Sequence, residues 1–289
     1  MWTRLRASVL AGGRTCLSAP VWASVRICPS ARVRGDTMTD PRAGGGAAPM
    51  SQAAPRLTFL LDVDNTLLDN DAAKTELGAR LAALLGEAGA ARFWDLYEVV
   101  RAEVGMVNVP LTLARFEQDI GLGTDAAPGG GTDRDRRFAL ADLVMRFPYD
   151  RFLYRGALAA VAHLRAMGRV AILSDGDPTF QTSKIWRAGL DAAVDGAVLV
   201  FGHKEEHLAE VTAAFPADHY VLVEDKPDII ARVRARLGAP LTTVLLRQGK
   251  YAAAAGAATP PWPGAHLTLD SIGDLVALDA AAFVRAGSD

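Results

Sequence analysis

Short, unbroken apolar segments constrain the fold of this chain more than any other feature of its sequence. The first covers residues 57–61, Leu-Thr-Phe-Leu-Leu, and stops abruptly at an aspartate. Similar segments follow at residues 170–173, 197–201, 220–223 and 242–246. None of them alternates apolar with polar residues, so each predicts a strand buried on both faces, as in a parallel sheet covered by helices.

Helical spacing of apolar residues separates these segments. Leu158, Val161 and Leu164 are expected to share one helix face, with Gly168 ending that helix. A similar pattern ends at Gly238. The regular alternation of strand and helix predicts an α/β fold with a doubly wound, Rossmann-like parallel sheet.

The interval from residue 71 to 150 interrupts this alternation. It contains several groups of apolar residues at helical spacing, among them Leu77 with Leu81, and Phe138 with Leu143 and Phe147. We therefore expect an all-helical cap at residues 71–150, inserted into a catalytic core formed by residues 55–70 and 151–289. A turn-rich stretch at residues 121–133 is expected to separate helices within this cap.

The N-terminal 54 residues differ in composition from the rest and are expected to form a flexible extension. Six arginines precede the first acidic residue, Asp36, and both cysteines of the chain lie here. This composition resembles a mitochondrial transit peptide, but an upstream extension before Met38 or Met50 is the favoured interpretation. The expected location is therefore cytoplasmic, with the mitochondrial matrix as the alternative. The lack of cysteine elsewhere excludes a disulfide or thiolate-metal core.

Net charge and hydropathy narrow the range of partners. The formal net charge is −2, which favours neither nucleic acid nor an anionic membrane surface. No apolar run approaches the roughly 18–20 residues that span a bilayer. Because the net charge is small, an anionic ligand would be held by a local site. The oligomeric state has no signature in the sequence.

Polar residues follow the first four apolar segments, at the points where the predicted strands end. They are Asp62 and Asp64 after the first, Ser174 after the second, Lys204 after the third, and Glu224 with Asp225 after the fourth. Ligands bind beyond the carboxyl ends of strands in open parallel sheets, so we expect these side chains to converge. Clustered carboxylates repel one another, and oxygen ligands near a phosphate favour Mg²⁺ as the counter-charge.

In order and residue type, these four strand ends resemble the signature motifs of the haloacid dehalogenase-like superfamily. The resemblance covers roughly residues 57–275 and implies a small phosphorylated metabolite as substrate. It implies the following roles: Asp62 as nucleophile, Asp64 as general acid and base, Ser174 and Lys204 as phosphate-binding residues, and Asp62, Glu224, Asp225 and the carbonyl group of Asp64 as Mg²⁺ ligands.

The sequence departs from the family pattern in two places. Asn65 stands where many members have glycine, and Lys204 lacks the proline that often follows it. A competing motif, His-x-x-Glu-His, runs from His203 to His207 and resembles an inverted zinc-protease signature. That signature requires a helix, whereas His203 follows a predicted strand, so zinc is disfavoured.

Asp64 decides between activities within the superfamily. The family's dehalogenases lack an acid at this position and need no metal, because a halide leaves without a proton. Asp64 together with the acidic pair at 224–225 therefore implies an Mg²⁺-dependent phosphohydrolase with an aspartyl-phosphate intermediate. A sugar-phosphate mutase of the same fold and a catalytically inactive phosphate-ligand-binding protein are the alternatives.

Overall fold

The computed structural model describes residues 55–120, 131–251 and 265–288. Its core is a six-stranded sheet in which all neighbouring strands are parallel. In order across the sheet, the strands are β3 (Val198–Phe201), β2 (Gly168–Asp175), β1 (Leu57–Leu61), β4 (His219–Glu224), β5 (Leu241–Leu246) and β6 (Leu267–Leu269). This arrangement is the predicted α/β, Rossmann-like fold; β6 is a short addition to the predicted strands.

Strand β1 lies at the centre of the sheet and pairs with β2 on one side and β4 on the other. All five of its residues are buried. The chain runs outward from β1 to β2 and β3 in one direction, then crosses back to β4 and β5 in the other. The carboxyl end of β1 is therefore the switch point of the sheet, where a cleft for ligands forms in folds of this kind.

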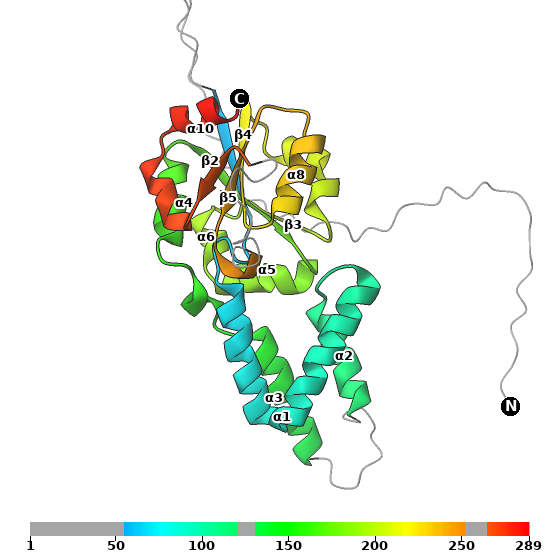
Figure 1. Cartoon of the computed structure of the whole chain (residues 1–289). Coiled ribbons are helices and arrows are strands. Elements are labelled where there is room, and N and C mark those ends of the chain that lie inside the picture. The colour runs from blue at the N-terminus through cyan, green and yellow to red at the C-terminus, as the bar shows by residue number, and fades with distance from the viewer. Residues whose placement is uncertain (1–54, 121–130, 252–264, 289) are drawn as a thin grey trace, which may run out of the picture.

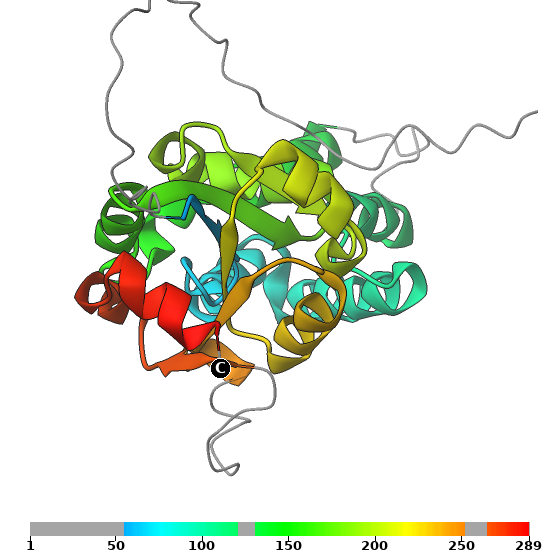
Figure 2. The same cartoon turned by 90° about the horizontal axis from the view of Figure 1, so that it is seen from above.

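Helices cover both faces of the sheet (Figure 2). One face packs against α4 (Ala157–Arg165), α5 (Pro178–Arg187), α6 (Leu190–Ala193), the 3-10 helix η3 (Ile272–Ala277) and α10 (Ala280–Ala286). The other face packs against α7 (Leu208–Ala214) and α8 (Pro227–Arg236). The strands lack alternation because side chains on both faces meet a hydrophobic layer.

Two expectations for the segment before β2 are wrong. Helix α4 buries Ala157, Val161 and Leu164, while Leu158 is 50% exposed, because a spacing of three residues drifts around a helix of 3.6 residues per turn. Gly168 does not end this helix but begins β2. A Cβ atom there would lie 2.5 Å from the carbonyl oxygen of Leu57, so glycine permits the close pairing of β1 with β2.

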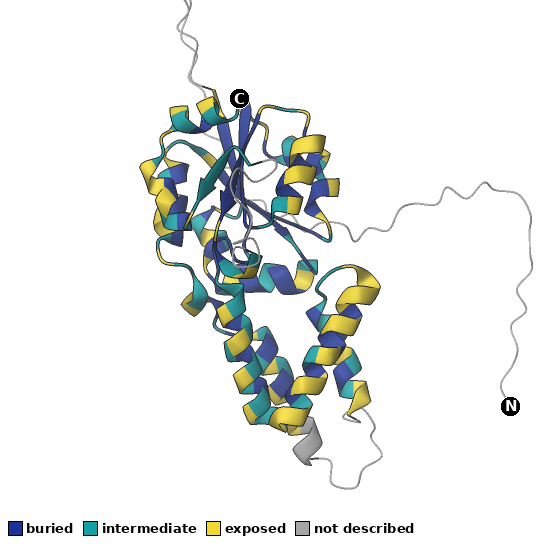
Figure 3. Cartoon of the chain, viewed as in Figure 1, coloured by how far each residue is buried: buried dark blue, intermediate teal, exposed yellow. Residues whose placement is uncertain are grey.

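Residues between β1 and α4 form helices that extend away from the sheet (Figure 1). They are α1 (Asn70–Val104), α2 (Val109–Asp119), α3 (Gly131–Met145) and the 3-10 helix η1 (Tyr149–Phe152). Gly86 interrupts α1 with a left-handed φ of 76°, and the two halves pack against each other, with Gly78 facing Trp94. Figure 3 shows that these helices bury the faces they turn toward one another.

Phe138 corrects the expected face of α3. It is 62% exposed, and Leu140 and Val144 are buried in its place, whereas Phe147 is buried as expected. The helical content expected for this region is present, but the face that packs is rotated. The reason is again that apolar spacing alone leaves the rotation of a helix loosely defined until its neighbours are known.

The loop between α1 and α2 touches the core. The backbone N–H of Asp177 donates to the carbonyl of Val107 at 3.2 Å, and the Asn108 amide donates to the Asp177 carboxylate at 3.4 Å. Asp177 also caps α5 by accepting from the backbone N–H of Phe180 at 2.9 Å. The helical region is thus linked directly to the start of α5.

The expected N-terminal extension at residues 1–54 lies outside the described residues, as does most of the turn-rich stretch at 121–133. Within the described part of the chain, no helix is both long and apolar enough to cross a membrane.

Candidate active site

Asp62 occupies the first position after β1, at the switch point of the sheet. Its backbone N–H still bonds to the carbonyl of Val223 in β4 at 3.0 Å, so the strand geometry fixes its position. The side chain is 1% exposed. One carboxylate oxygen, Oδ1, accepts from Lys204, and the other, Oδ2, is buried without a hydrogen-bond partner.

Lys204 brings a positive charge into the centre of this site. It begins the 3-10 helix η2 (Lys204–Glu206) just beyond β3, and its side chain is fully buried. Its Nζ atom lies 2.6 Å from Asp62 and 2.6 Å from Glu224, and 3.8 Å from Asp175. One lysine therefore joins carboxylates at the carboxyl ends of β1, β2 and β4.

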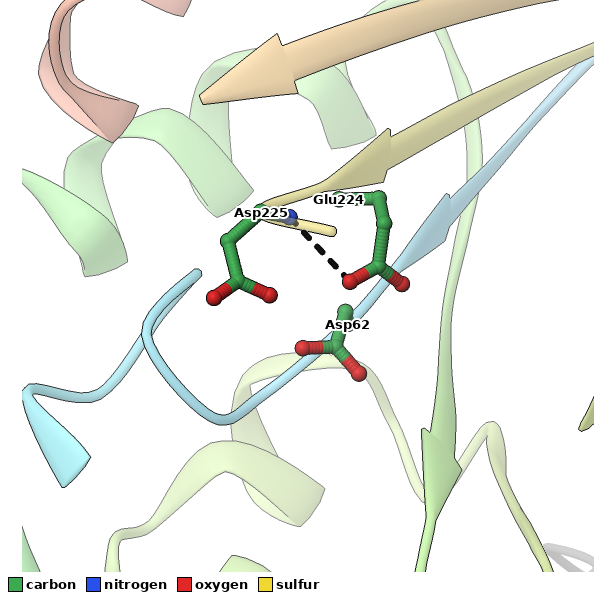
Figure 4. Close-up of side chains that lie close together, drawn as sticks. All are labelled: Asp62, Glu224 and Asp225. Atoms are coloured by element: carbon green, nitrogen blue, oxygen red, sulfur yellow. Dashed lines mark hydrogen bonds between the residues drawn. The ribbon is translucent and has the colours of Figure 1, made fainter. Parts of the chain in front are cut away.

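Glu224 and Asp225 end β4 beside Asp62 (Figure 4). Glu224 is fixed by its Oε1 atom, which accepts from the backbone N–H groups of Asp225 and Lys226 at 3.1 Å each. Both carboxylate oxygens of Asp225 are buried without a hydrogen-bond partner. Asp62, Glu224 and Asp225 each place an oxygen within 4.8 Å of the others. The unpaired, buried oxygens of Asp62 and Asp225, with Glu224 beside them, fit a hard divalent cation.

The charges of the site support this fit. Five carboxylates, from Asp62, Asp64, Asp175, Glu224 and Asp225, face four lysines, Lys74, Lys184, Lys204 and Lys226, so one formal negative charge remains. Burial and the neighbouring Glu224 raise the pKa of Asp62 to about 6, although the charge of Lys204 opposes them. Burial and the neighbouring Glu224 and Asp62 also raise the pKa of Asp225. A cation would relieve both carboxylates.

Asp64 lies two residues beyond Asp62 but faces a different partner. Its oxygens are 2.7 and 2.9 Å from the Nζ of Lys184 on α5, and Gln181 donates to it at 3.4 Å. Burial acts to raise the pKa of Asp64, but the charge and hydrogen bond of Lys184, together with the charges of Lys226 and Lys74, outweigh it, and the pKa lies below its ordinary value. The carboxylate is thus held ionised at the edge of the cleft, 26% exposed.

Ser174 sits near the end of β2 and is buried. Its hydroxyl accepts from the Gln181 side chain at 2.9 Å. Gln181 therefore contacts both Ser174 and Asp64. Sequence reasoning did not identify Gln181 and Lys184. The available signal was their i, i+3 spacing, which places them on one face of the helix that follows Ser174.

The turn after Asp64 explains the first departure from the family pattern. Asn65 adopts a left-handed φ of 62°, a conformation that suits glycine and that asparagine tolerates. Its side chain accepts from the backbone N–H of Asn70 at 3.1 Å, and Gln248 bonds to the carbonyls of Asn65 and Thr66 at 3.3 and 3.0 Å. Asparagine therefore supplies the turn and a link to the first helix of α1.

The zinc motif lacks the geometry that it requires. His207 stacks on Phe201 with ring centroids 4.4 Å apart and bonds to Glu210 at 2.8 Å. The segment between the two histidines is a 3-10 turn of three residues. Among the described residues, the one group of His, Cys, Asp and Glu side chains close enough to hold a metal is the carboxylate cluster of Asp62, Glu224 and Asp225.

Comparison with known proteins assigns the family. Residues 57–246 match the family of haloacid dehalogenase-like hydrolases. The chain is also 39% identical to a haloacid dehalogenase-like hydrolase from Burkholderia xenovorans LB400, with 78% of this chain and 99% of that one covered at a TM-score of 0.67. The chain belongs to the haloacid dehalogenase-like hydrolases. No curated protein matches it by sequence.

More distant structures share the fold. A haloacid dehalogenase-like family hydrolase from Xanthomonas campestris is 19% identical over 83% of this chain and 97% of its own, with a TM-score of 0.53. A 2-haloacid dehalogenase from Pseudomonas syringae pv. Tomato DC3000 is 15% identical over 76% of this chain and 96% of its own, also with a TM-score of 0.53. At these identities the similarity is one of architecture.

Proposed function

We propose that this hydrolase is an Mg²⁺-dependent phosphohydrolase that acts on a small phosphorylated metabolite through an aspartyl-phosphate intermediate. The observation that carries the proposal is the buried carboxylate cluster at the end of β1 and β4, in which Asp62 keeps one oxygen unpaired. Lys204 contacts both Asp62 and Glu224, so positive charge is available beside the nucleophile, where a phosphoryl group would bind.

Asp62 is the nucleophile in this proposal. Its carboxylate attacks phosphorus, the bond from phosphorus to the ester oxygen breaks, and the phosphoryl group is carried on Asp62 until water displaces it. Lys204 and the Ser174 hydroxyl bind the non-bridging oxygens, whose negative charge they stabilise. Burial favours this chemistry because charge interactions are stronger where water is excluded.

Asp64 acts as the general acid and then as the general base in this proposal. It protonates the departing ester oxygen and takes a proton from the water that later attacks the phosphorylated Asp62. In the structure its ion pair with Lys184 holds it as a carboxylate. A bound phosphate adds negative charge nearby and thereby raises the pKa of the Asp64 carboxyl, which favours the protonated form needed in the first step.

Mg²⁺ would be held by Asp62, Glu224 and Asp225, and by the Asp64 carbonyl that the family resemblance implies as a further ligand. When bound, it would neutralise the negative charge that the carboxylates and the phosphate bring together. Asp62 would then be ionised at neutral pH despite its burial.

The choice of phosphate chemistry over dehalogenation rests on Asp64. A halide leaves as a stable anion and needs no proton, whereas an alkoxide is strongly basic. An acid placed beside the nucleophile and exposed to the cleft serves only the second leaving group. A mutase differs in transferring the phosphoryl group to a second substrate hydroxyl instead of water, and it remains the alternative within the same chemistry.

A substrate screen tests the proposal. The purified protein is assayed for phosphate release from p-nitrophenyl phosphate and a panel of phosphorylated metabolites, with Mg²⁺ and with excess chelator, and for halide release from 2-chloropropionate. We expect phosphate release that requires Mg²⁺ and no halide. Halide release without phosphate release would establish a dehalogenase, and isomerisation of a sugar phosphate without free phosphate would establish a mutase.

Two matched variants then separate the aspartates. Asp62→Asn removes the attacking oxygen and should abolish turnover of every ester. Asp64→Asn should lose most of the roughly 10²–10⁴-fold contribution of general acid catalysis on alkyl phosphates, and much less on p-nitrophenyl phosphate, whose leaving group is stabilised by its ring. Equal losses on both ester types, with dephosphorylation shown not to limit the rate, would remove the general-acid role from Asp64.

A further inference from the structure

A cleft of about 350 Å³ lies over the candidate active site, between the helical region and the sheet. Its floor includes Asp64 and Lys226, and its walls include side chains from both halves of α1. A cavity of this size suits a metabolite of a few carbon atoms. The residues on the helical side of the cleft therefore face the part of the substrate that leaves.

Lys74 is the notable cation on this wall. It is half-buried on the first half of α1, and its Nζ donates to the hydroxyl of Tyr97 at 2.8 Å. The same Nζ lies 4.5 Å from the centre of the Tyr97 ring. Trp94 packs edge-on against Tyr97, with centroids 5.3 Å apart. The second half of α1 therefore holds the ammonium group in place.

Lys74 differs from Lys184 and Lys204, two other lysines of the site. Lys184 and Lys204 contact carboxylates at 2.7 and 2.6 Å. Within the residues that the structure describes, no carboxylate forms an ion pair with Lys74. Burial lowers the pKa of Lys74, and the nearby Asp64 carboxylate is the strongest charge opposing this. An ammonium in this setting gains from an anionic partner that enters the cleft.

The surroundings favour a carboxylate as that partner. A single ammonium, with one donor already used by Tyr97, matches the single charge of a carboxylate, and the proposed function already places the phosphate at Lys204. Arg101 follows Tyr97 by one helical turn and also lines the cleft, but it is exposed and pairs with Glu98 at 3.3 Å. Lys74 is thus the available cation of the wall.

We propose that Lys74, held by Tyr97, binds a carboxylate on the leaving group, and that the preferred substrates are small phosphorylated hydroxy acids. The proposal rests on the phosphohydrolase function proposed above. The phosphate would lie at Asp62 and Lys204, with the carboxylate turned toward α1. The cap wall would then select the substrate while the end of the sheet performs the chemistry.

The test compares two esters with the same carbon skeleton. 3-Phosphoglycerate bears a carboxylate where glycerol 3-phosphate bears a neutral hydroxymethyl group, and uridine 5′-monophosphate serves as a larger substrate. The variant is Lys74→Met, which keeps the length of the side chain and removes the charge. The matched control is Lys250→Met, which removes a lysine that lines the same cleft but is exposed. Thermal melting of each variant confirms that it is folded.

We expect the wild type to prefer 3-phosphoglycerate over glycerol 3-phosphate by about tenfold or more in kcat/KM, as a hydrogen bond between charged groups provides. Lys74→Met should lose this preference through 3-phosphoglycerate alone, and Lys250→Met should keep it. Tyr97→Phe, which retains the charge but loses the hydroxyl that holds it, should lose part of it. Three results would each overturn the proposal. They are an unchanged preference for 3-phosphoglycerate in Lys74→Met, no such preference in the wild type, and a preference for uridine 5′-monophosphate that is the same in the wild type and in Lys74→Met.

A binding measurement keeps this test apart from that of the hydrolase function. Calorimetry with Asp62→Asn, alone and combined with Lys74→Met, reports affinity for 3-phosphoglycerate and glycerol 3-phosphate without turnover. If no ester is hydrolysed but 3-phosphoglycerate binds more tightly in a way that depends on Lys74, the carboxylate subsite stands and the phosphohydrolase function falls. If turnover occurs without any effect of Lys74 on binding, the subsite falls and the function stands.

Discussion

Replacement of Lys184 by methionine isolates the ion pair that holds Asp64. Lys184 is 6% exposed, and its Nζ lies 2.7 and 2.9 Å from the two Asp64 oxygens. Removal of one partner from a fully buried ion pair costs about 3–5 kcal/mol. Asp64 is 26% exposed, so water from the cleft can solvate it once Lys184 is gone. The loss in free energy of unfolding should therefore be smaller, about 1–3 kcal/mol.

The assay is thermal unfolding followed by circular dichroism. For a domain of this size a loss of 1–3 kcal/mol corresponds to a fall in Tm of roughly 2–12 °C. Lys250→Met removes an exposed lysine and should stay within about 0.5 kcal/mol of the wild type. Asp64→Asn combined with Lys184→Met should cost less than the two single substitutions added together, since the double variant leaves no unpaired charge.

The pH dependence gives a second readout. The pKa of Asp64 is lowered in the folded protein, so its ion pair stabilises the fold above the pKa of an unfolded aspartate, about 3.9. That contribution is lost as pH falls through the lower folded pKa. The difference in Tm between wild type and Lys184→Met should therefore have its full size at pH 7. It should shrink as the pH falls below about 3.9 and through the lower pKa of folded Asp64. A difference that is absent at pH 7, or that grows in acid, would refute the reasoning.

Three further outcomes are expected. Asp225→Asn should raise the Mg²⁺ concentration needed for half-maximal phosphatase activity, and excess chelator should abolish the activity of the wild type. Activity that is unchanged by the substitution and by the chelator would contradict a metal at the carboxylate cluster. Deletion of residues 1–50 should leave Tm and turnover unchanged, because the segment has no periodic apolar face; aggregation of the shortened protein would show otherwise. Gly249→Ala should lower the free energy of unfolding by about 1–3 kcal/mol, since Gly249 has a φ of 65° and a Cβ atom there would lie 2.5 Å from the Asn65 side chain; an unchanged denaturant midpoint would count against this.

Local sequence determines the strands of this protein well. A run such as residues 57–61 carries its own evidence, because a strand buried on both faces must be apolar throughout. The order of strands and helices follows from the alternation of the two patterns, and the position of polar residues after each run predicts where ligands gather. Asp62, Lys204, Glu224 and Asp225 meet as that argument expects.

Helix rotation required the tertiary structure. Leu158 and Phe138 both belong to convincing apolar patterns, yet both are exposed, because the neighbouring helices and strands choose which residues of a broad apolar arc are buried. The turn at Gly86 that folds α1 into two packed halves was equally hidden. A single glycine inside a helical pattern is compatible with either a continuous helix or a reversal.

The partners of the charged groups were decided by the tertiary structure alone. Spacing places Asp62 and Asp64 on the same side of an extended chain, but the fold gives them different lysines, Lys204 from η2 and Lys184 from α5. Lys74 meets Tyr97 only because α1 reverses. Sequence patterns determine which residues end a strand or face a core, since these are local properties. Contacts between side chains more than a hundred residues apart depend on the packing of whole elements, which local patterns do not encode.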